Sequence, residues 1–141
     1  MTPIHRFRMR IYWEDTDAGG IVYHSNYLKF AERARTEMVR GLGVRQAALA
    51  AAGHAFAVAH ADVAFRAPAR LDDELEVESR LHAVGGASME MEQTIYRLDE
   101  RIELVRLNIR LAFITLTANR PARMPAELRR SLADYVSERR D

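Results

Sequence analysis

The order of two hydrophobic periodicities constrains the fold of this 141-residue chain more than any other feature. Apolar side chains recur at spacings of three and four between Tyr27 and Leu42, as on one face of a helix. Apolar and polar residues then alternate along 75–81, 89–95 and 105–113, a period typical of strands with one buried face. Strands grouped after a single long helix predict an α+β fold with a mainly antiparallel sheet.

Shorter patterns add the remaining strands and helices. Every second residue from Phe7 to Trp13 is apolar, which predicts a first strand there. A weaker strand is expected at 55–65, a short alanine-rich helix at 44–52 and a surface helix at 126–139. The expected architecture is a single two-layer domain of about five strands and one long helix, which is enclosed if the sheet curls around it.

The ends of the long helix carry residues that are common at helix termini. Ser25 and Asn26 are both suitable caps for its N-terminus. Gly41 and Gly43 follow the last turn, where glycine commonly ends a helix. We therefore expect the helix to begin close to residue 26 and to end close to residue 41.

Composition argues against several classes of protein. The formal net charge is +1, so no overall field attracts nucleic acid or an anionic membrane. The chain has no cysteine, which excludes disulfides, thiolate metal sites and cysteine nucleophiles and fits the cytoplasm. The first residues lack the apolar run of a signal peptide, and no stretch approaches the ~18 apolar residues of a membrane span. We expect a cytoplasmic protein with no nucleic acid partner and no membrane span.

Familiar catalytic and cofactor motifs are missing. The sequence has no G-x-S-x-G nucleophile elbow, no phosphate-binding loop and no G-x-G-x-x-G fingerprint. The spacing of His54, His60 and Asp62 matches no compact set of metal ligands. We therefore expect neither a metal ion nor a redox cofactor.

The segment from Tyr12 to Tyr27 contains the most informative residues. Asp15 and Asp17 stand on a glycine-containing turn that leads into the N-terminus of the long helix. The first amides of a helix have no partner within it, and the helix dipole favours negative charge there. A carboxylate beside such donors supplies a base or nucleophile and an oxyanion site for acyl transfer. The same residues also fit a capped turn with two solvated acids.

This segment resembles the signature of the 4-hydroxybenzoyl-CoA thioesterase family, in the branch encoded alongside the bacterial Tol–Pal envelope system. Two further stretches follow in the order that the family has, so the resemblance covers nearly the whole chain. The matching residues are Asp15-Thr16-Asp17, Gly20, Val22-Tyr23-His24, Asn26-Tyr27, Glu32-Arg33-Ala34-Arg35, Pro68 to Leu75 and, more loosely, Arg120 to Pro125.

The resemblance implies the hotdog fold, with dimers that share one continuous sheet and often pair into tetramers, and with active sites at the dimer interface. It implies that Asp17 is the catalytic carboxylate and that Asp15 shapes the turn. The His24 amide would hold the thioester carbonyl oxygen, and its imidazole would position water or polarise the substrate. Tyr23 would line the pocket, whereas Tyr27 would mainly pack in the core.

The coenzyme-binding residues are less defined. The resemblance places Arg120 and Arg123 near positions that hold the nucleotide phosphates in related enzymes, and simple solvation of both is the alternative. The hydroxybenzoyl-specific branch has basic residues before the strand serine, whereas Gly85-Gly86-Ala87 precede Ser88 here. This departure argues against hydroxybenzoyl-CoA as the substrate.

The predicted function is hydrolysis of acyl-CoA to a carboxylic acid and free CoA, which is part of the substrate and not a cofactor. Asp17 would act either as a general base or as a nucleophile. Two alternatives remain open: a hotdog protein that acts on acyl carrier protein substrates or as a hydratase, and a non-enzymatic module that binds acyl carrier protein or an envelope-associated partner.

Overall fold

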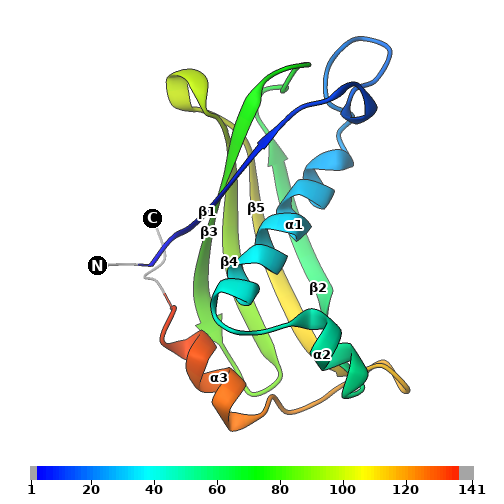
Figure 1. Cartoon of the computed structure of the whole chain (residues 1–141), viewed down its shortest axis with the longest axis vertical. Coiled ribbons are helices and arrows are strands. Elements are labelled where there is room, and N and C mark those ends of the chain that lie inside the picture. The colour runs from blue at the N-terminus through cyan, green and yellow to red at the C-terminus, as the bar shows by residue number, and fades with distance from the viewer. Residues whose placement is uncertain (1–2, 137–141) are drawn as a thin grey trace.

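One antiparallel sheet and a helix lying across one of its faces make up the computed structural model, which describes residues 3–136 (Figure 1). Five long strands run in the order β1-β3-β4-β5-β2, and a two-residue strand, β6, pairs with β5. Their bounds are His5–Arg10 (β1), His54–Phe65 (β2), Glu74–Val84 (β3), Ser88–Arg97 (β4), Ile102–Thr115 (β5) and Arg120–Pro121 (β6). The predicted α+β class and the sheet around one long helix are confirmed, with β6 as an addition.

The helices occupy the predicted parts of the chain. The long helix α1 spans Asn26–Gly41, α2 spans Gln46–Ala51 and α3 spans Ala126–Ala133. Two short 3-10 helices, η1 and η2, cover Trp13–Asp15 and Asp99–Arg101. Gly43 has a φ of +87°, a left-handed conformation that suits glycine and turns the chain away from α1. Within residues 3–136, none of these helices combines the length and the apolar composition that crossing a membrane requires.

Three details of the sequence-based prediction were wrong. The first strand stops at Arg10, and Trp13 lies in η1 with 74% of its surface exposed, because the chain leaves the sheet there. The residue at the N-cap of α1 is Ser25, but its side chain makes no capping hydrogen bond. The last helix ends at Ala133 and not at Arg139, although residues 137–139 lie outside the described part of the chain.

The two faces of the sheet differ in chemistry. The face that contacts α1 is apolar, and its centre includes Leu75, Leu107 and Phe113, all fully buried. The opposite face carries charged side chains, among them Glu76 and Glu78, which are also buried. This division matches the alternation in the sequence, because successive side chains of a strand point to opposite faces.

The β2 strand is one of the two edges of the sheet and contains a β-bulge. Val58 pairs with Leu111 and His60 with Arg110, so Ala59 is an extra residue in the ladder. Large parts of Val58 and Phe65 are exposed. In the described chain, β2 pairs only with β5, which leaves its other edge open to a partner.

Candidate active site

Asp17 stands at the first corner of a small hairpin immediately before α1. Thr16 and Val22 pair antiparallel, and the Asp17 amide donates to the carbonyl oxygen of Ile21 at 2.9 Å. The Gly20 amide donates in turn to the Asp17 carbonyl oxygen at 3.0 Å. Gly20 has a φ of +77°, so a side chain at this position would strain the turn. The glycine that the sequence places three residues after Asp17 therefore closes the hairpin.

The Asp17 carboxylate is exposed and only lightly held. Its Oδ1 atom accepts a hydrogen bond from the Gly19 amide at 2.8 Å. Among residues 3–136, no other group donates to this carboxylate. One oxygen is thus oriented by the backbone, while the other is available to a water molecule or a substrate. A carboxylate in this condition is suited to act as a base or a nucleophile.

Asp15 has a different environment, although it lies only two residues away. It is 8% exposed, and its Oδ2 atom accepts a hydrogen bond from the Tyr12 amide at 2.9 Å. Its carbonyl oxygen accepts hydrogen bonds from the Tyr23 amide at 3.1 Å and from Nδ2 of Asn26 at 2.9 Å. These bonds fasten the hairpin to the start of α1, which supports a structural role for Asp15.

The start of α1 presents unpaired backbone donors. Ser25 provides no side-chain cap, and Asn26 directs its side chain to Asp15 instead. Within the described residues, no group accepts a hydrogen bond from the amide of His24. Free amides at a helix N-terminus, together with the helix dipole, favour a negatively charged oxygen. The arrangement is suitable for stabilising the oxyanion of an acyl-transfer reaction.

The His24 imidazole lies at a cavity of about 340 Å³ between the start of α1 and the end of β2. Its ring is 4.5 Å from that of Tyr23 and 6.2 Å from that of Phe65, measured between centroids. Tyr23 is half exposed, and it contacts His24 without itself lining this cavity. The cavity walls also include Phe65 and Arg66, which sequence reasoning did not identify. Their signal was an aromatic residue at the end of a strand, just before Pro68.

Tyr27 has the packing role that the sequence suggested. Its ring is buried against Phe30, and its hydroxyl oxygen accepts a hydrogen bond from the Ala69 amide at 2.9 Å. Burial raises the pKa of the Tyr27 hydroxyl, and the hydrogen bond from Ala69 opposes this shift. Tyr27 therefore connects α1 to the segment after β2, and it also lines the His24 cavity.

Arg120 and Arg123 lie far from Asp17 within one chain. Arg120 pairs with Thr115, which pairs with His54 at the beginning of β2, whereas Phe65 beside His24 is at the end of that strand. The twelve residues of β2 correspond to roughly 35 Å. Figure 1 shows the loop before α1 and the segment before α3 at opposite ends of the molecule. A single chain thus does not bring these arginines to the hairpin that carries Asp17.

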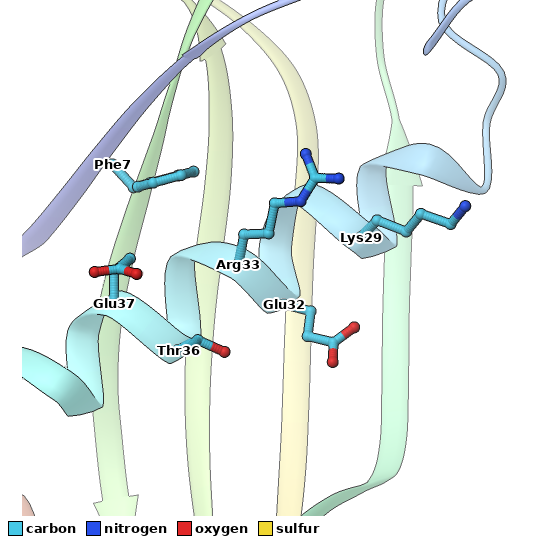
Figure 2. Close-up of a pocket in the computed structure, with 6 residues that line it drawn as sticks. All are labelled: Phe7, Lys29, Glu32, Arg33, Thr36 and Glu37. Carbon is cyan, nitrogen blue, oxygen red and sulfur yellow. The ribbon is translucent and has the colours of Figure 1, made fainter. Parts of the chain in front are cut away.

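A cavity larger than the one at His24 lies away from the predicted site. It measures about 540 Å³ and lies between α1 and Phe7 of β1, with Lys29, Arg33 and Glu37 along the helix (Figure 2). None of the predicted catalytic or substrate-binding residues lines it. In the part of the chain that the structure describes, no group of three or more histidine, aspartate or glutamate side chains is placed to hold a metal ion.

Comparison with known proteins connects this geometry to a family. The model of the thioesterase-like superfamily matches residues 11–132. An acyl-CoA thioester hydrolase of Escherichia coli, YbgC, is 45% identical over 101 residues, which are 72% of this chain and 75% of that protein. The acyl-CoA thioesterase YbgC of Haemophilus influenzae is 39% identical over 124 residues, 87% of this chain and 90% of that protein.

A solved structure agrees with these relatives. The crystal structure of a probable thioesterase from Bartonella henselae has a TM-score of 0.80 and 35% identity, and the match covers 86% of this chain and 99% of that one. The expected hotdog fold is therefore confirmed. With its sheet, its long helix and the turn before that helix, the chain belongs to the thioesterase-like superfamily.

Proposed function

We propose that this protein hydrolyses acyl-CoA thioesters to a carboxylic acid and free CoA, with Asp17 and the start of α1 as its active site. One observation supports the assignment of the site. The available carboxylate of Asp17 and the free amide of His24 lie on one short segment, which the hydrogen bonds of Asp15 hold to the start of α1. The names of the E. coli and H. influenzae relatives support the reaction.

The proposed reaction uses these groups in sequence. The His24 amide donates to the thioester carbonyl oxygen and stabilises the negative charge that develops there, an effect of about 3 kcal/mol for one such donor. Asp17 removes a proton from water as the water oxygen attacks the carbonyl carbon. The carbon–sulfur bond then breaks, the acid leaves, and the CoA sulfur receives the proton.

A nucleophilic role for Asp17 is the alternative mechanism, because the same carboxylate could attack the carbonyl and form a mixed anhydride. We favour the general base, since the His24 imidazole adds a second polar group that positions water. A single turnover in heavy-oxygen water, with enzyme in excess, separates the two mechanisms. Mass spectrometry should find no label in the Asp17 peptide, and a label absent from a substrate-free control would establish the anhydride.

An oligomer would bring the remaining predicted residues to the site. Antiparallel pairing of two β2 edges would extend the sheet and cover the exposed Val58 and Phe65. The His54 end of each strand would then lie beside the Phe65 end of the other, so Arg120 and Arg123 would reach the partner's active site. We propose a dimer of this kind, paired into a tetramer, in which these arginines bind the CoA phosphates.

Two measurements test the oligomer. Light scattering should give at least twice the mass of the 16.1 kDa chain. Replacing Arg120 and Arg123 together by alanine should raise KM for acyl-CoA several-fold and leave kcat nearly unchanged. An active monomer would refute the shared site, and an unchanged KM would leave both arginines as solvated surface residues.

We place the enzyme in the cytoplasm, in association with the Tol–Pal system, on the basis of the family resemblance and the lack of cysteine. Acyl carrier protein is the alternative carrier of the acyl group. A panel of acyl-CoAs and acyl carrier protein thioesters, followed by thiol detection, tests both substrate and reaction. We expect thiol release from acyl-CoA, whereas a protein that only binds its ligand would release none.

A further inference from the structure

The loop between β2 and β3 contains a turn at residues 68–73 that backs the small hairpin before α1. The Val22 amide donates to the Ala69 carbonyl oxygen at 2.9 Å, and Ile21 forms an antiparallel bridge with Arg70. Ala69 is fully buried, so water does not compete for these bonds. One edge of the returning hairpin strand is therefore fixed by the 68–73 turn.

The same turn also contacts α1 and the end of β1. The Ala69 amide donates to the Tyr27 hydroxyl oxygen at 2.9 Å. The Asp72 amide donates to the Ile11 carbonyl oxygen at 3.1 Å, and the Ile11 amide donates to the Asp73 carbonyl oxygen at 2.9 Å. The position of the turn is thus linked to both halves of the proposed active site, the hairpin and the start of α1.

Two charged side chains hold the turn in shape. Oδ2 of Asp73 accepts hydrogen bonds from the Arg70 amide at 2.8 Å and from Nε of Arg97 at 3.2 Å. Nη2 of Arg97 donates to the Pro68 carbonyl oxygen at 2.9 Å. One guanidinium at the end of β4 therefore binds both the first and the last residue of the turn. The side chains of the ion pair are only 25% and 23% exposed, which strengthens these charge-assisted bonds.

The backbone of the turn depends on such contacts. Asp72 has a φ of +71°, in the left-handed region that residues other than glycine seldom adopt. This conformation persists only where the surrounding structure holds it. Without the ion pair of Asp73 and Arg97, the turn keeps its backbone hydrogen bonds but loses the side chain that joins its two ends. We therefore expect it to become looser.

We propose that Arg97 and Asp73 are positioning residues of the active site, which act on Asp17 and on the His24 amide through the 68–73 turn. The ion pair holds the turn, and the turn holds the hairpin against the start of α1. A misplacement of about 1 Å can reduce a catalysed rate by about a hundredfold, so a looser hairpin should slow the reaction. This inference rests on the proposed thioesterase function and extends it to residues remote from the reacting atoms.

Arg97→Met tests this role on the intact protein. Methionine keeps part of the length of the side chain but removes its charge and its N–H donors. We expect kcat to fall by about tenfold and KM for acyl-CoA to stay within about twofold, because the turn orients the reacting groups and does not bind CoA. The free energy of unfolding should fall as well.

Arg106→Met is the matched control for the loss of stability. Arg106 pairs with Glu103 at 2.6 Å in the same sheet, and the two side chains are 30% and 22% exposed, close to the values of the tested pair. Among residues 3–136, Arg106 forms no hydrogen bond or ion pair with the 68–73 turn or with the hairpin. This variant should lose a similar amount of stability and keep the wild-type kcat.

Hydrogen exchange observes the hairpin directly and needs no turnover. The Val22 amide, which donates to Ala69, should exchange about tenfold faster in Arg97→Met than in Arg106→Met. Mass spectrometry of peptides that cover residues 17–23 measures this difference. A general loss of stability would speed exchange equally in both variants, so a difference between them reports the local contact.

Asp73→Asn decides the question if Arg97→Met does not fold. Asparagine has nearly the same shape, and its side-chain oxygen can still accept from the Arg70 amide, but the charge that attracts Arg97 is lost. We expect kcat to fall several-fold with an unchanged KM.

The inference is overturned by a wild-type kcat in Arg97→Met or, if that variant does not fold, in Asp73→Asn. Equal effects of Arg97→Met and Arg106→Met on kcat, or on exchange at residues 17–23, would also contradict it, because they would reflect stability alone. If the wild-type protein hydrolyses no acyl-CoA, the proposed function fails. The exchange experiment then still decides whether the ion pair holds the hairpin.

Discussion

Carboxylates occur in two regions of this molecule, and their partners differ. On the charged face of the sheet, Glu76 is 3% exposed and has Arg8 and Arg101 at 3.2 Å and 3.0 Å. In the hairpin before α1, Asp17 is exposed, and its carboxylate accepts one hydrogen bond, from a backbone amide. A carboxylate saturated by guanidinium groups stabilises the fold but has no free oxygen for chemistry. A carboxylate oriented by a single amide keeps one oxygen available, so the second region is where we propose that the chemistry takes place.

The largest difference between the regions is expected for Asp17. Asp17→Asn removes the proton acceptor or nucleophile, so kcat should fall by about a thousandfold while the circular dichroism spectrum is unchanged. Glu14→Gln, three residues earlier in η1 and also exposed, is the matched control and should keep wild-type activity. A folded Asp17→Asn protein that hydrolyses acyl-CoA at the wild-type rate would refute the site.

The converse experiment changes the saturated carboxylate. Glu76→Gln removes the counter-charge of Arg8 and one of the two carboxylates that pair with Arg101, which keeps Glu78. We expect the free energy of unfolding to fall by about 2 kcal/mol. The effect is moderate because both arginines are partly exposed and screened by water. Glu74→Gln, at the half-exposed ion pair with Arg10, is the control and should change stability little. Denaturant titration measures both, and kcat should stay unchanged in each.

Asp15→Asn tests the boundary between the two regions, because Asp15 is buried like Glu76 but lies beside Asp17. The asparagine loses the charge that strengthens the hydrogen bond from the Tyr12 amide, so stability should fall by about 1 kcal/mol. Activity should fall by about tenfold, since the hairpin would be less firmly held to α1. A loss of activity as large as that of Asp17→Asn, with full stability, would instead assign a chemical role to Asp15.

The smallest expected effect is the loss of stability at acid pH. Burial raises the pKa of Glu76, but the hydrogen bonds and charges of Arg101 and Arg8 outweigh it, and the pKa is lowered overall. The pKa of Glu103 is lowered in the same way, with burial opposed by Arg106 and Arg66. These interactions contribute fully above the ordinary value of 4.5, and the contribution is lost as pH falls through the lowered pKa.

The measurement is the free energy of unfolding as a function of pH. Near neutral pH, these two glutamates should cause no change in the free energy of unfolding. Below the ordinary glutamate pKa, the free energy of unfolding should decline. The decline should be shallower in Glu76→Gln, because one of the two titrating groups is removed. An identical decline in the wild type and the variant would show that Glu76 makes no contribution to acid sensitivity.

The sequence correctly predicted the helices and strands in which one buried face determines the hydrophobic pattern. The α1 helix and the strands β3, β4 and β5 are of this kind, and all were predicted. The β2 strand gave a weaker signal because it is an edge with many exposed residues. Trp13 was assigned to a strand because its position continues the alternation, whereas the chain has already turned into η1.

The parts of the candidate site that local turns determine could be predicted from the sequence. The parts that depend on contacts between distant segments could not. The Asp17 hairpin and the start of α1 are neighbours in sequence, so their association follows from the turn residues. Phe65 reaches His24 only through the sheet, and no local pattern announces that contact. The burial of Arg35 had a signal that was not used, since residues 27, 31 and 35 follow one another at helical spacing on the buried face.

The extra residue Ala59 changes which side chains of β2 face α1. Before it, the even-numbered Phe56 and Val58 face α1, and after it the odd-numbered Val63 and Phe65 do. Deleting any one residue between Val58 and Val63 would remove the bulge and keep all four side chains on their present faces, whereas a deletion elsewhere in the strand would turn part of it inside out. A one-residue change in the length of this strand is therefore tolerated best between these two valines, and a one-residue gap in related chains is expected there.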